Sequence, residues 1–501
     1  MSSTPPPATA SSLPPALPAH RQLFYGGEWH DARHGATWEL FSPGDGSALG
    51  PCADASDRDV DAAVRAADTA FREWRDTAPF ERARILRHAA DVIRGHSTEL
   101  ALIDAYDGGN AIAPMTGDIE AAAQQLEFFA GLITQLKGET IPMGNGRFNF
   151  TLRQPLGVVA RIGAFNHPVM FSAGKVAAPL AAGNTVIVKP PEQAPLSTLR
   201  LAELWEDVFP RGVFNVVTGQ GKETGEALVR HPGVAKVGLI GSIAAGRAVM
   251  KAASDTLKPV LLELGGKNAL IGFPDSDLSA LADAIVAGMN FAWCGQSCGS
   301  TSRVFLHEAI HDQVLAAVLQ RLPDFKPGLP QLSATTMGAI VDARQHHRIL
   351  DYIEHGKREG ATLAYGGRVP DDPALSKGLF VLPTVFSDVT ADMRIAREEI
   401  FGPVLSVLRW NDEEAVISQV NGLEYGLTCS IWTNDISTAL RTSERIEAGY
   451  VWVNEVGRHF LSAPFGGFKQ SSTGREECFD ELVGFTQTKN VHVRFKGATT
   501  R

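Results

Sequence analysis

Short apolar runs alternate with amphipathic segments through the middle of the chain, beginning at Gly157. The apolar runs are rich in β-branched residues and predict buried strands at Val158–Ile162, Thr185–Val188, Phe214–Val217, Val234–Ile240 and Val260–Leu264. The segments between them predict helices at Val169–Ala182, Leu196–Val208, Gly221–Arg230 and Ala244–Ser254. Strands separated by helices of this length indicate right-handed βαβ crossovers and a mostly parallel sheet, which is an α/β fold.

Helical periodicity also precedes this region, and a second α/β region follows it. Asp57–Ala78 and Pro79–Asp107 each carry one apolar face and predict helices. Between about residues 265 and 473, strands are predicted near Arg303–Leu306, Val404–Leu408, Thr428–Trp432 and Gly449–Val453. Thr151–Arg153 and Thr486–Arg494 alternate like exposed strands, and they could pair with each other or with another subunit.

The composition is ordinary for a soluble globular protein. The chain has 501 residues, of which 44% are hydrophobic and 20% charged, enough for a large core spread over roughly two to four domains. Its 46 basic and 56 acidic residues give a formal net charge of −10, which disfavours binding to nucleic acid or to an anionic membrane. No apolar run approaches the ~20 residues needed to span a bilayer.

The cysteines and the N-terminus indicate where the protein works. Five scattered cysteines are too few for a disulfide framework and favour a reduced, intracellular setting, which we take to be the cytoplasm. Residues 1–21 are rich in Pro, Ala and Ser and lack the basic and apolar parts of a secretion signal. We therefore expect a disordered tail.

A parallel sheet predicts a ligand site outside the carboxyl ends of its strands, where Asn166, Lys189 and Gly241 fall. Gly219 and Gly221, followed by Gly225, are spaced one residue wider than the usual dinucleotide-binding pattern. This segment could equally be a loop that begins an ordinary helix.

Two further segments bear on the cofactor. Gly241 and Ser242 directly follow a strand and could meet a diphosphate at a helix N-terminus, or Ser242 could simply cap that helix. Lys189 and Glu192, at the end of the second strand, can bind the two hydroxyls of an adenosine ribose. A carboxylate there would repel a 2′-phosphate and favour NAD over NADP, although such a Pro-rich tetrapeptide alone would more often be a surface turn.

Cys298 and Glu263 supply a nucleophile and a candidate general base, the pairing that covalent catalysis at a carbonyl requires. A lone cysteine is more often inert core, and a lone glutamate here would simply end a strand. Cys294 and Cys298 could suggest a metal or redox pair. No second Cys/His pair of zinc spacing accompanies them, so no metal site is predicted.

Several motifs, taken in order, resemble those of the aldehyde dehydrogenase superfamily. They are Phe165-Asn166-His167-Pro168, Lys189-Pro190-Pro191-Glu192, Gly241-Ser242, Glu263-Leu264-Gly265-Gly266-Lys267, Gly295-Gln296-Ser297-Cys298, Glu398–Val404, Gly449–Asn454, Pro464–Lys469 and Gly474–Glu476. The resemblance covers essentially residues 22 to 495. It implies an NAD-dependent enzyme that oxidises an aldehyde to the carboxylic acid.

The resemblance also implies a three-part subunit. A Rossmann-like NAD-binding domain would comprise about residues 22–134 and 155–264, and an α/β catalytic domain about 265–473. A small β oligomerisation element would comprise 135–154 and 474–501. Members of the family are dimers or tetramers, so we expect a homodimer or homotetramer.

The matching positions imply a role for each catalytic residue. Cys298 would attack the aldehyde, and Asn166 with the backbone N–H of Cys298 would bind the oxyanion that forms. Glu263 would activate water to hydrolyse the resulting thioester, and Lys175 and Glu476 would relay protons.

Further positions imply cofactor contacts. Glu399 and Phe401 would hold the nicotinamide ribose and ring. Lys189, Glu192, Gly221, Gly241 and Ser242 would hold the adenosine and diphosphate part.

The substrate is less clearly indicated. Tunnel positions by resemblance are His167, Met170, Phe171, Gly174, Trp293, His459 and Phe460. Many relatives carry tryptophan where this chain has Gly174, so a wider tunnel is expected. His167 and His459 stand where two aromatic residues would cage a quaternary ammonium, which disfavours betaine aldehyde. We expect a fairly bulky apolar or aromatic aldehyde.

Three rival functions are open. In a CoA-acylating relative, the thiol of coenzyme A resolves the thioester; such enzymes generally lack the glutamate that matches Glu263. A catalytically silent structural or binding protein would not need Cys298, Glu263, Asn166 and Lys189 together. A cofactor-independent cysteine esterase would not need the segments assigned to NAD.

Overall fold

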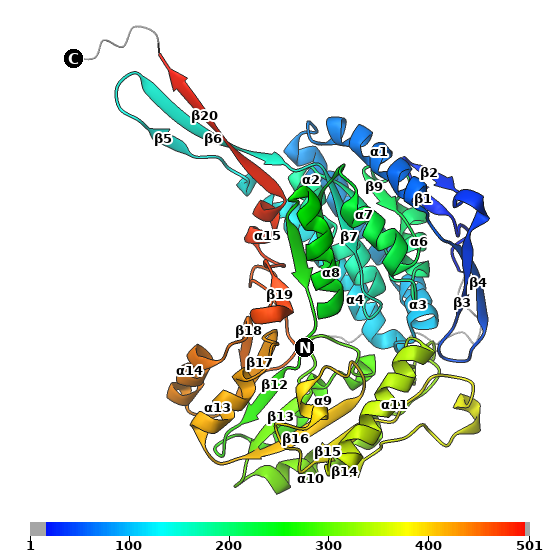
Figure 1. The fold of residues 1–501 in the computed structure, drawn as a ribbon, viewed down its shortest axis with the longest axis vertical. Coiled ribbons are helices and arrows are strands. Elements are labelled where there is room, and N and C mark those ends of the chain that lie inside the picture. The colour runs from blue at the N-terminus through cyan, green and yellow to red at the C-terminus, as the bar shows by residue number, and fades with distance from the viewer. Residues whose placement is uncertain (1–16, 496–501) are drawn as a thin grey trace.

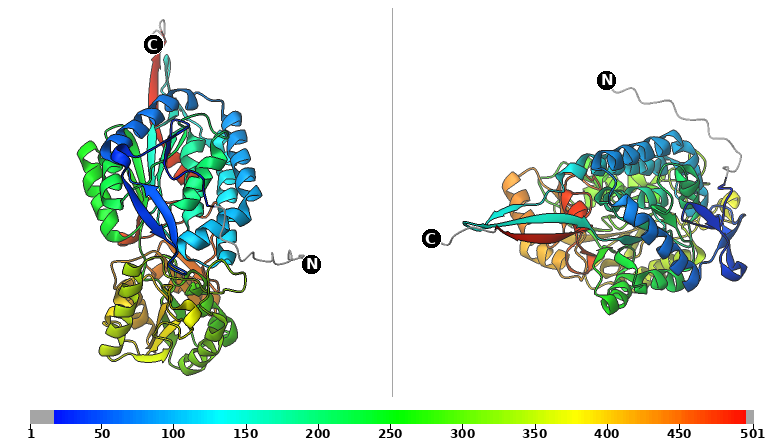
Figure 2. Two further views of the ribbon diagram at one scale, coloured as in Figure 1. Left: turned by 90° about the vertical axis from the view of Figure 1, so that its right-hand side faces the viewer. Right: turned by 90° about the horizontal axis from the view of Figure 1, so that it is seen from above.

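The computed structural model describes residues 17–495 and contains two α/β bodies stacked along the long axis, with a β arm projecting from one of them (Figure 1). The mixed α/β fold is as predicted. Within the described residues, no helix is both long enough and apolar enough to cross a bilayer. The first body is built mostly from the N-terminal half, and the second from residues after Gly265 (Figure 2).

The first body contains an eight-stranded sheet in the order β19-β11-β10-β7-β8-β9-β1-β2. Its five central strands are parallel and confirm the five predicted, with ends shifted by at most one residue: β7 Val158–Ile162, β8 Thr185–Lys189, β9 Phe214–Val216, β10 Val234–Ile240 and β11 Val260–Glu263. Antiparallel edge strands were not predicted: β1 Leu23–Tyr25, β2 Glu28–His30 and β19 Ser472–Thr473. A separate antiparallel ribbon is formed by β3 Thr37–Phe41 and β4 Ala48–Ala53.

Helices cover both faces of this sheet, because successive side chains of each strand point to opposite sides. Val158 and Ala160 of β7 pack in one core with α1, α7 and α8, whereas Val159 packs in another with α2 to α6. The helices are α1 Asp57–Trp74, α2 Pro79–Gly95, α3 Ser97–Gly108, α4 Ile112–Leu132, α5 Ala177–Ala182, α6 Leu196–Trp205, α7 Glu226–Arg230 and α8 Ile243–Ala253.

Three predicted helices differ from the structure in more than the position of their ends. Pro79–Asp107 is two helices, because the His96 ring nitrogen bonds the carbonyl of Val92 and caps the end of α2. Val169–Ala182 and Gly221–Arg230 each begin with a five-residue π-helical turn, at Met170–Gly174 and Gly221–Gly225. Apolar periodicity marks the buried face and does not distinguish one helical hydrogen-bond pattern from another.

The second body contains a seven-stranded sheet in the order β14-β15-β16-β13-β12-β17-β18. The four predicted strands are confirmed as β13 Arg303–His307, β16 Val404–Trp410, β17 Thr428–Trp432 and β18 Tyr450–Val453. Three were not predicted: β12 Ala269–Gly272, β14 Thr362–Tyr365 and β15 Thr384–Ser387. The surrounding helices are α9 Leu278–Gly288, α10 His311–Arg321, α11 Ala343–Arg358, α12 Arg394–Arg397, α13 Glu413–Asn421 and α14 Ile436–Arg445.

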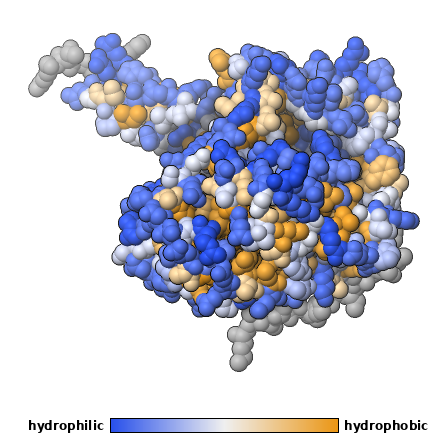
Figure 3. All heavy atoms as spheres, turned by 60° about the horizontal axis from the view of Figure 1, so that its bottom comes forward, coloured by the Kyte–Doolittle hydropathy of each residue, from blue (hydrophilic) through white to orange (hydrophobic). Residues whose placement is uncertain are grey.

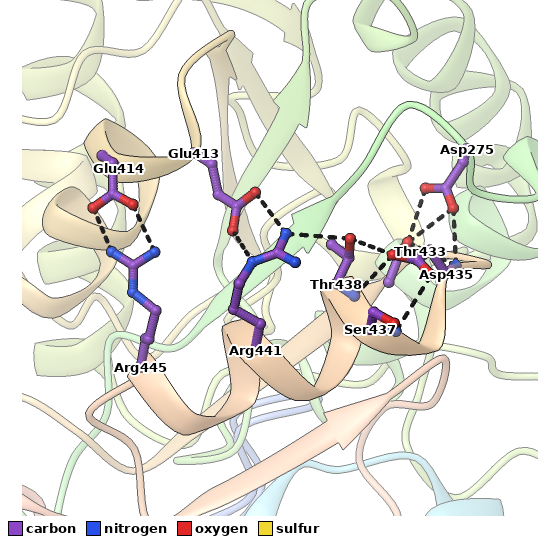
Figure 4. A network of polar contacts seen from close by, with 9 residues as sticks. All are labelled: Asp275, Glu413, Glu414, Thr433, Asp435, Ser437, Thr438, Arg441 and Arg445. Atoms are coloured by element: carbon purple, nitrogen blue, oxygen red, sulfur yellow. Dashed lines mark hydrogen bonds and ion pairs between the residues drawn. The ribbon is translucent and has the colours of Figure 1, made fainter.

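A polar network fixes α14 to the rest of the second body (Figure 4). Arg441 forms a bidentate ion pair with Glu413 of α13, and Arg445 forms one with Glu414 of the same helix. Asp435 caps the helix by accepting the N–H groups of Ser437 and Thr438. Exposed pairs of this kind each contribute only about 0.2–1 kcal/mol, so they orient α14 more than they stabilise the domain.

The arm is a three-stranded antiparallel sheet of β5 Thr140–Pro142, β6 Arg147–Pro155 and β20 Thr486–Arg494, and α15 Phe479–Gly484 leads into it. The two isolated segments predicted from their alternation therefore pair with each other within one chain, in register from Arg147 opposite Arg494 to Pro155 opposite Thr486. Apolar side chains remain exposed on the arm, among them Ile141, Met143 and Leu152 (Figure 3).

Five residues of the predicted disordered tail, Leu17–Arg21, are described by the structure, and they contact the first body. Residues 1–16 lie outside the described residues. Leu17 packs against the core of the first body, and the backbone N–H of His20 donates to Glu203 at 2.7 Å. His20 also stacks on Trp29, with ring centroids 4.4 Å apart. These contacts place Leu17–Arg21 on the first body rather than in a disordered tail.

Candidate active site

One cavity of about 890 Å³ collects most of the predicted site residues. It lies at the carboxyl ends of the parallel strands of the first body, where loops of the second body close over it. The predicted residues that line it are Asn166, Lys189, Glu192, Gly221, Gly241, Ser242, Glu263, Cys298, Glu399 and Phe401. Lys175, Glu476 and the seven tunnel residues are not among its lining residues.

The Cys298 loop is held by one side-chain hydrogen bond and by two close backbone approaches at glycines. Asn268 donates its side-chain amide to the carbonyl of Cys298 at 2.6 Å. A Cβ on Gly266 would lie 2.8 Å from that carbonyl, and one on Gly295 would lie 2.3 Å from the carbonyl of Gly402. Both glycines are therefore needed for the close approach of these segments.

The Cys298 thiol is held in its protonated form. Burial raises its pKa to about 12, and the nearby Glu399 and Glu263 carboxylates act in the same direction. The backbone N–H groups of Cys298 and Gly299 oppose this shift only partly. Attack on a carbonyl therefore requires that a base remove the proton or that a ligand change these surroundings.

The loop after β7 carries Asn166, and polar side chains of the α3–α4 region hold it from behind. Asn110 donates to the carbonyl of Asn166 at 2.9 Å, and Asp104 accepts the N–H of Val169 at 3.3 Å. Asp118 pairs with the ring of His167 at 2.7 Å. Sequence reasoning missed these three supports, because Asp104 lies in a helix predicted from apolar periodicity alone and no element was predicted at Asn110 or Asp118. A buried polar residue in an apolar helix face could have pointed to them.

Glu263 ends β11 and lies at the inner wall of the cavity. Its Oε1 accepts the Ser472 hydroxyl at 2.7 Å, and its Oε2 has no hydrogen-bond partner among the described residues. Burial, reinforced by Glu476, raises the pKa of Glu263 well above the ordinary value. The neutral form is therefore favoured at rest.

Lys175 and Glu476 belong to a buried ionic cluster next to Glu263. Lys175 Nζ lies 2.9 Å from Glu476 Oε2 and 3.1 Å from Glu477 Oε1, and Arg161 donates to Glu476 at 2.8 Å. Burial alone would raise the pKa of Glu476, but Lys175 and Arg161 hold it below the ordinary value. Glu481 accepts the backbone N–H of Glu477, and burial together with Glu476 raises its pKa to about 8.

Lys189 and Glu192, the two residues predicted to bind the adenosine ribose, lie together on the wall of the cavity. Lys189 Nζ lies 3.3 Å from Glu192 Oε2, and burial lowers the pKa of this lysine despite Glu192. Gly221 stands directly against Glu192, since a Cβ on it would lie 3.4 Å from the carboxylate. Ser242 caps α8 by accepting the N–H of Ala245, so the capping alternative is observed at a helix N-terminus that still opens on the cavity.

The opposite end is formed by Glu399 and Phe401. Glu399 accepts the N–H of Gly266 at 2.9 Å, and burial raises the pKa of Glu399 to about 7. Phe401 adopts a left-handed backbone (φ 57°) and meets Phe165 edge to face, with ring centroids 5.6 Å apart. Gln345 fixes this turn by donating to the carbonyls of Ile400 and Phe401.

The tunnel residues fall into two groups. His167 lies near Phe171 and Trp293, with ring centroids 5.3 and 5.8 Å away. The ring of His459 stacks against Tyr450, and its centroid lies 4.3 Å from that of Phe465. The ring of Phe460 is about half exposed and lies beside Arg458. Met170 lies in the π-helical turn.

The expectation that Gly174 widens a tunnel is wrong in this structure. A Cβ at Gly174 would point at α4, 2.7 Å from Gln125 Oε1 and 3.4 Å from the Cα of Ala122. The side chain of Gln125 already fills that direction. Glycine here allows a close helix contact and opens no space for substrate.

Comparison with known proteins agrees with this geometry. The model of the aldehyde dehydrogenase family matches residues 29–491. The chain is 51% identical over 503 residues to aldehyde dehydrogenase tropH of Talaromyces stipitatus, covering 98% of this chain and 97% of that protein. The NAD+ complex of a Bacillus cereus aldehyde dehydrogenase has a TM-score of 0.92 at 39% identity, covering 95% of this chain and 96% of that one.

A second solved structure is a mutant of the P. syringae indole-3-acetaldehyde dehydrogenase AldA in complex with NAD+ and IAA. Its TM-score is 0.93 at 36% identity, covering 96% of this chain and 98% of that one. The two-body α/β fold, the cavity lined by both bodies and these matches define an NAD-linked oxidoreductase. The chain belongs to the aldehyde dehydrogenase family.

NAD is therefore the cofactor, and the residues of the cavity fit it. The helix N-terminus at Ser242 and the Lys189–Glu192 pair offer donors and acceptors for a diphosphate and a ribose. Glu399 offers carboxylate oxygens for the second ribose.

Proposed function

We propose that the protein oxidises a bulky apolar or aromatic aldehyde to the free carboxylic acid through a thioester on Cys298. The observation that carries the proposal is that Cys298, Asn166 and Glu263 line the same cavity as the residues that fit NAD. A nucleophile, an oxyanion donor and a base therefore share one cavity.

The first chemical step is addition of the Cys298 sulfur to the aldehyde carbon. The thiol first gives its proton to the carboxylate form of Glu263, the sulfur adds as the thiolate, and the carbonyl oxygen becomes an oxyanion that the Asn166 amide and the Cys298 backbone N–H stabilise. NAD, when bound, would supply the acceptor for the hydride that leaves the substrate carbon as the thioester forms. Glu399 and Phe401 would hold that end of the cofactor.

The second step is hydrolysis of the thioester. Glu263 in its carboxylate form takes a proton from water as the water oxygen attacks the thioester carbon, and the Cys298 thiolate leaves. Lys175 and Glu476 carry the proton onward from Glu263. The raised pKa of Glu263 supports this role, because a base must hold a proton well enough to receive it.

The same glutamate argues for a free acid product. A CoA-acylating enzyme leaves hydrolysis out, and it has no use for a buried carboxylate beside the thioester. Product analysis with and without coenzyme A separates these functions. Formation of an acyl-CoA as fast as NADH is formed would contradict the proposal.

A preference for NAD over NADP rests on Glu192. A carboxylate at this position would repel the 2′-phosphate of NADP, and Glu192 pairs with Lys189 on the wall of the cavity, which supports the preference. Replacement of Glu192 by serine should lower the KM for NADP relative to that for NAD, measured at saturating aldehyde.

The substrate class is supported by a relative and by the local aromatic residues. One similar structure is an indole-3-acetaldehyde dehydrogenase, which acts on an aromatic aldehyde. In this chain, Phe171 and Trp293 provide an apolar surface near His167. An NADH-formation screen over aliphatic, aromatic, terpenoid and amino aldehydes tests the class, with Cys298→Ala as the control that should abolish turnover.

We further propose that the enzyme is a cytoplasmic homodimer or homotetramer. The exposed apolar residues of the arm support self-association, because a projecting sheet gains from pairing with a second copy.

A further inference from the structure

Hydrolysis in the proposed function leaves a proton in a closed part of the molecule. Water supplies an OH group to the thioester carbon, and its remaining proton goes to Glu263, which must lose it before the next turnover. Glu263 and Glu476 are 5% and 1% exposed, and Glu263 meets solvent only through the cavity that NAD and the substrate would occupy. An exit route for this proton is therefore required.

The buried cluster continues beyond Glu476 in one direction. Lys175 bridges the two adjacent carboxylates, at 2.9 Å from Glu476 and 3.1 Å from Glu477. The other oxygen of Glu477 lies 3.1 Å from Nδ1 of His459. The side chains become more exposed along this line, from 4% for Lys175 to 8% for Glu477 and 37% for His459.

The local backbone holds this line in place. Glu477 has a left-handed backbone (φ 63°), which costs free energy for a residue other than glycine. The N–H of Ser462 donates to the carbonyl of Glu477 at 2.7 Å, and this bond brings the loop that carries His459 against the cluster. Tyr450 and Phe465 pack against the imidazole. The remaining charged groups around Lys175 and Glu477 are Arg161 and Glu481.

We propose that Glu477 and His459 form the outer half of a proton exit route from the active site, which rests on the hydrolytic function proposed above. The relay of the proposed function brings the proton from Glu263 to Glu476 and Lys175, and Lys175 passes one of its own N–H protons to Glu477. Glu477 passes a proton to Nδ1 of His459, and Nε2 of the same ring releases one to solvent. The carboxylates and Lys175 return to their starting states, whereas His459 ends as its Nδ1–H tautomer and is reset by a flip of its partly exposed ring. One proton leaves per thioester hydrolysed.

A proton carried by His459 predicts rescue by a small diffusible base. The His459→Phe variant keeps a ring of similar shape against Tyr450 and Phe465 but cannot carry a proton. In dilute non-imidazole buffer, with NAD and aldehyde saturating, its kcat should fall by at least about tenfold with little change in KM. Added imidazole should restore kcat, and Glu477→Gln should show the loss without full restoration.

The chain offers a matched control. His20 is bound through Nδ1 to Glu203 at 3.1 Å, is 43% exposed, and stacks on an aromatic ring away from the cavity. His20→Phe should have the wild-type kcat, and added imidazole should not change it.

Two outcomes overturn the exit route. A wild-type kcat for His459→Phe in dilute buffer would show that the proton leaves elsewhere. A lowered kcat that imidazole does not restore would show that His459 only anchors its loop. Glu263→Gln tests the underlying function separately: if it hydrolyses the thioester at the wild-type rate, the proposed function itself fails.

Discussion

At the residue scale, burial works against the chemistry proposed for Cys298 and Glu263. Both groups have pKa values raised by burial, so both favour the protonated form at neutral pH. A thiol needs to ionise to attack, and a carboxylic acid must ionise to act as a base. Activity should therefore rise as the pH is raised above neutral.

Alkylation of Cys298 reports this directly. Because the thiol pKa is about 12, the thiolate fraction in the enzyme without cofactor should rise about tenfold per pH unit between pH 7 and 9. The rate of inactivation by iodoacetamide, measured across that range, should rise in parallel. A rate that levels off near pH 7 would mean that the thiol is already ionised at rest.

Replacement of Asn166 by alanine tests the oxyanion role. Loss of one such donor should reduce kcat by about 100-fold or more, since a donor of this type contributes on the order of 3 kcal/mol to the barrier. Steady-state kinetics should show little change in the KM for NAD. A variant with unchanged kcat would remove Asn166 from the mechanism.

At the element scale, the loop after β7 is positioned by polar groups of the α3–α4 region. Asn110 fixes the backbone of Asn166, Asp118 fixes His167, and Asp104 fixes Val169. These contacts connect a helix pair with no catalytic residue of its own to the geometry of the oxyanion site.

Asn110→Ala should therefore affect catalysis more than binding. Loss of a hydrogen bond worth about 1 kcal/mol should lower kcat about fivefold through misplacement of Asn166. The matched control is Gln124→Ala in α4, where the exposed side chain donates a hydrogen bond to Glu120 and lies away from the Asn166 loop. Equal effects of both variants in a kinetic assay would indicate general destabilisation of α4.

The elements also show what a single sequence can predict. The parallel strands were found because each is an uninterrupted apolar run between amphipathic helices. The hairpin of β1 and β2 was missed, although Gly26-Gly27 between two short strands is a hairpin signal. β15 is short and directly follows Pro383, so it resembles a loop in the sequence.

Site prediction divides along similar lines. Cys298, Glu263 and Asn166 lie in short motifs that follow strands, and the strand ends bring them to one cavity. Glu477 and Asn110 could not be found in this way, because their contacts join segments hundreds of residues apart or approach the loop from behind. Gly174 shows the converse: its neighbour Gln125 on α4, not its own small size, determines the space beside it.

At the scale of the whole molecule, residues of both bodies line the cavity. The arm extends away from both bodies (Figures 1 and 2). The arm buries little of its own surface in one chain, which leaves Ile141 and Leu152 exposed. Assembly of two or more chains would cover this apolar surface.

Leu152→Asp should shift the assembly toward smaller species. Analytical ultracentrifugation should show a lower sedimentation coefficient or a concentration-dependent equilibrium. Val369→Asp is the control, because Val369 is similarly exposed but lies in a loop of the second body. An unchanged coefficient for Leu152→Asp would contradict a role for the arm in assembly.

The central claim is that a thioester on Cys298 links oxidation to hydrolysis by Glu263. Intact-protein and peptide mass spectrometry of Glu263→Gln, quenched in acid during turnover with NAD and an aromatic aldehyde, tests it most directly. The account predicts an acyl adduct on the peptide that contains Cys298, approaching one per subunit, and none on Cys298→Ala. NADH formation by Glu263→Gln at the wild-type rate with no adduct on Cys298 would contradict it.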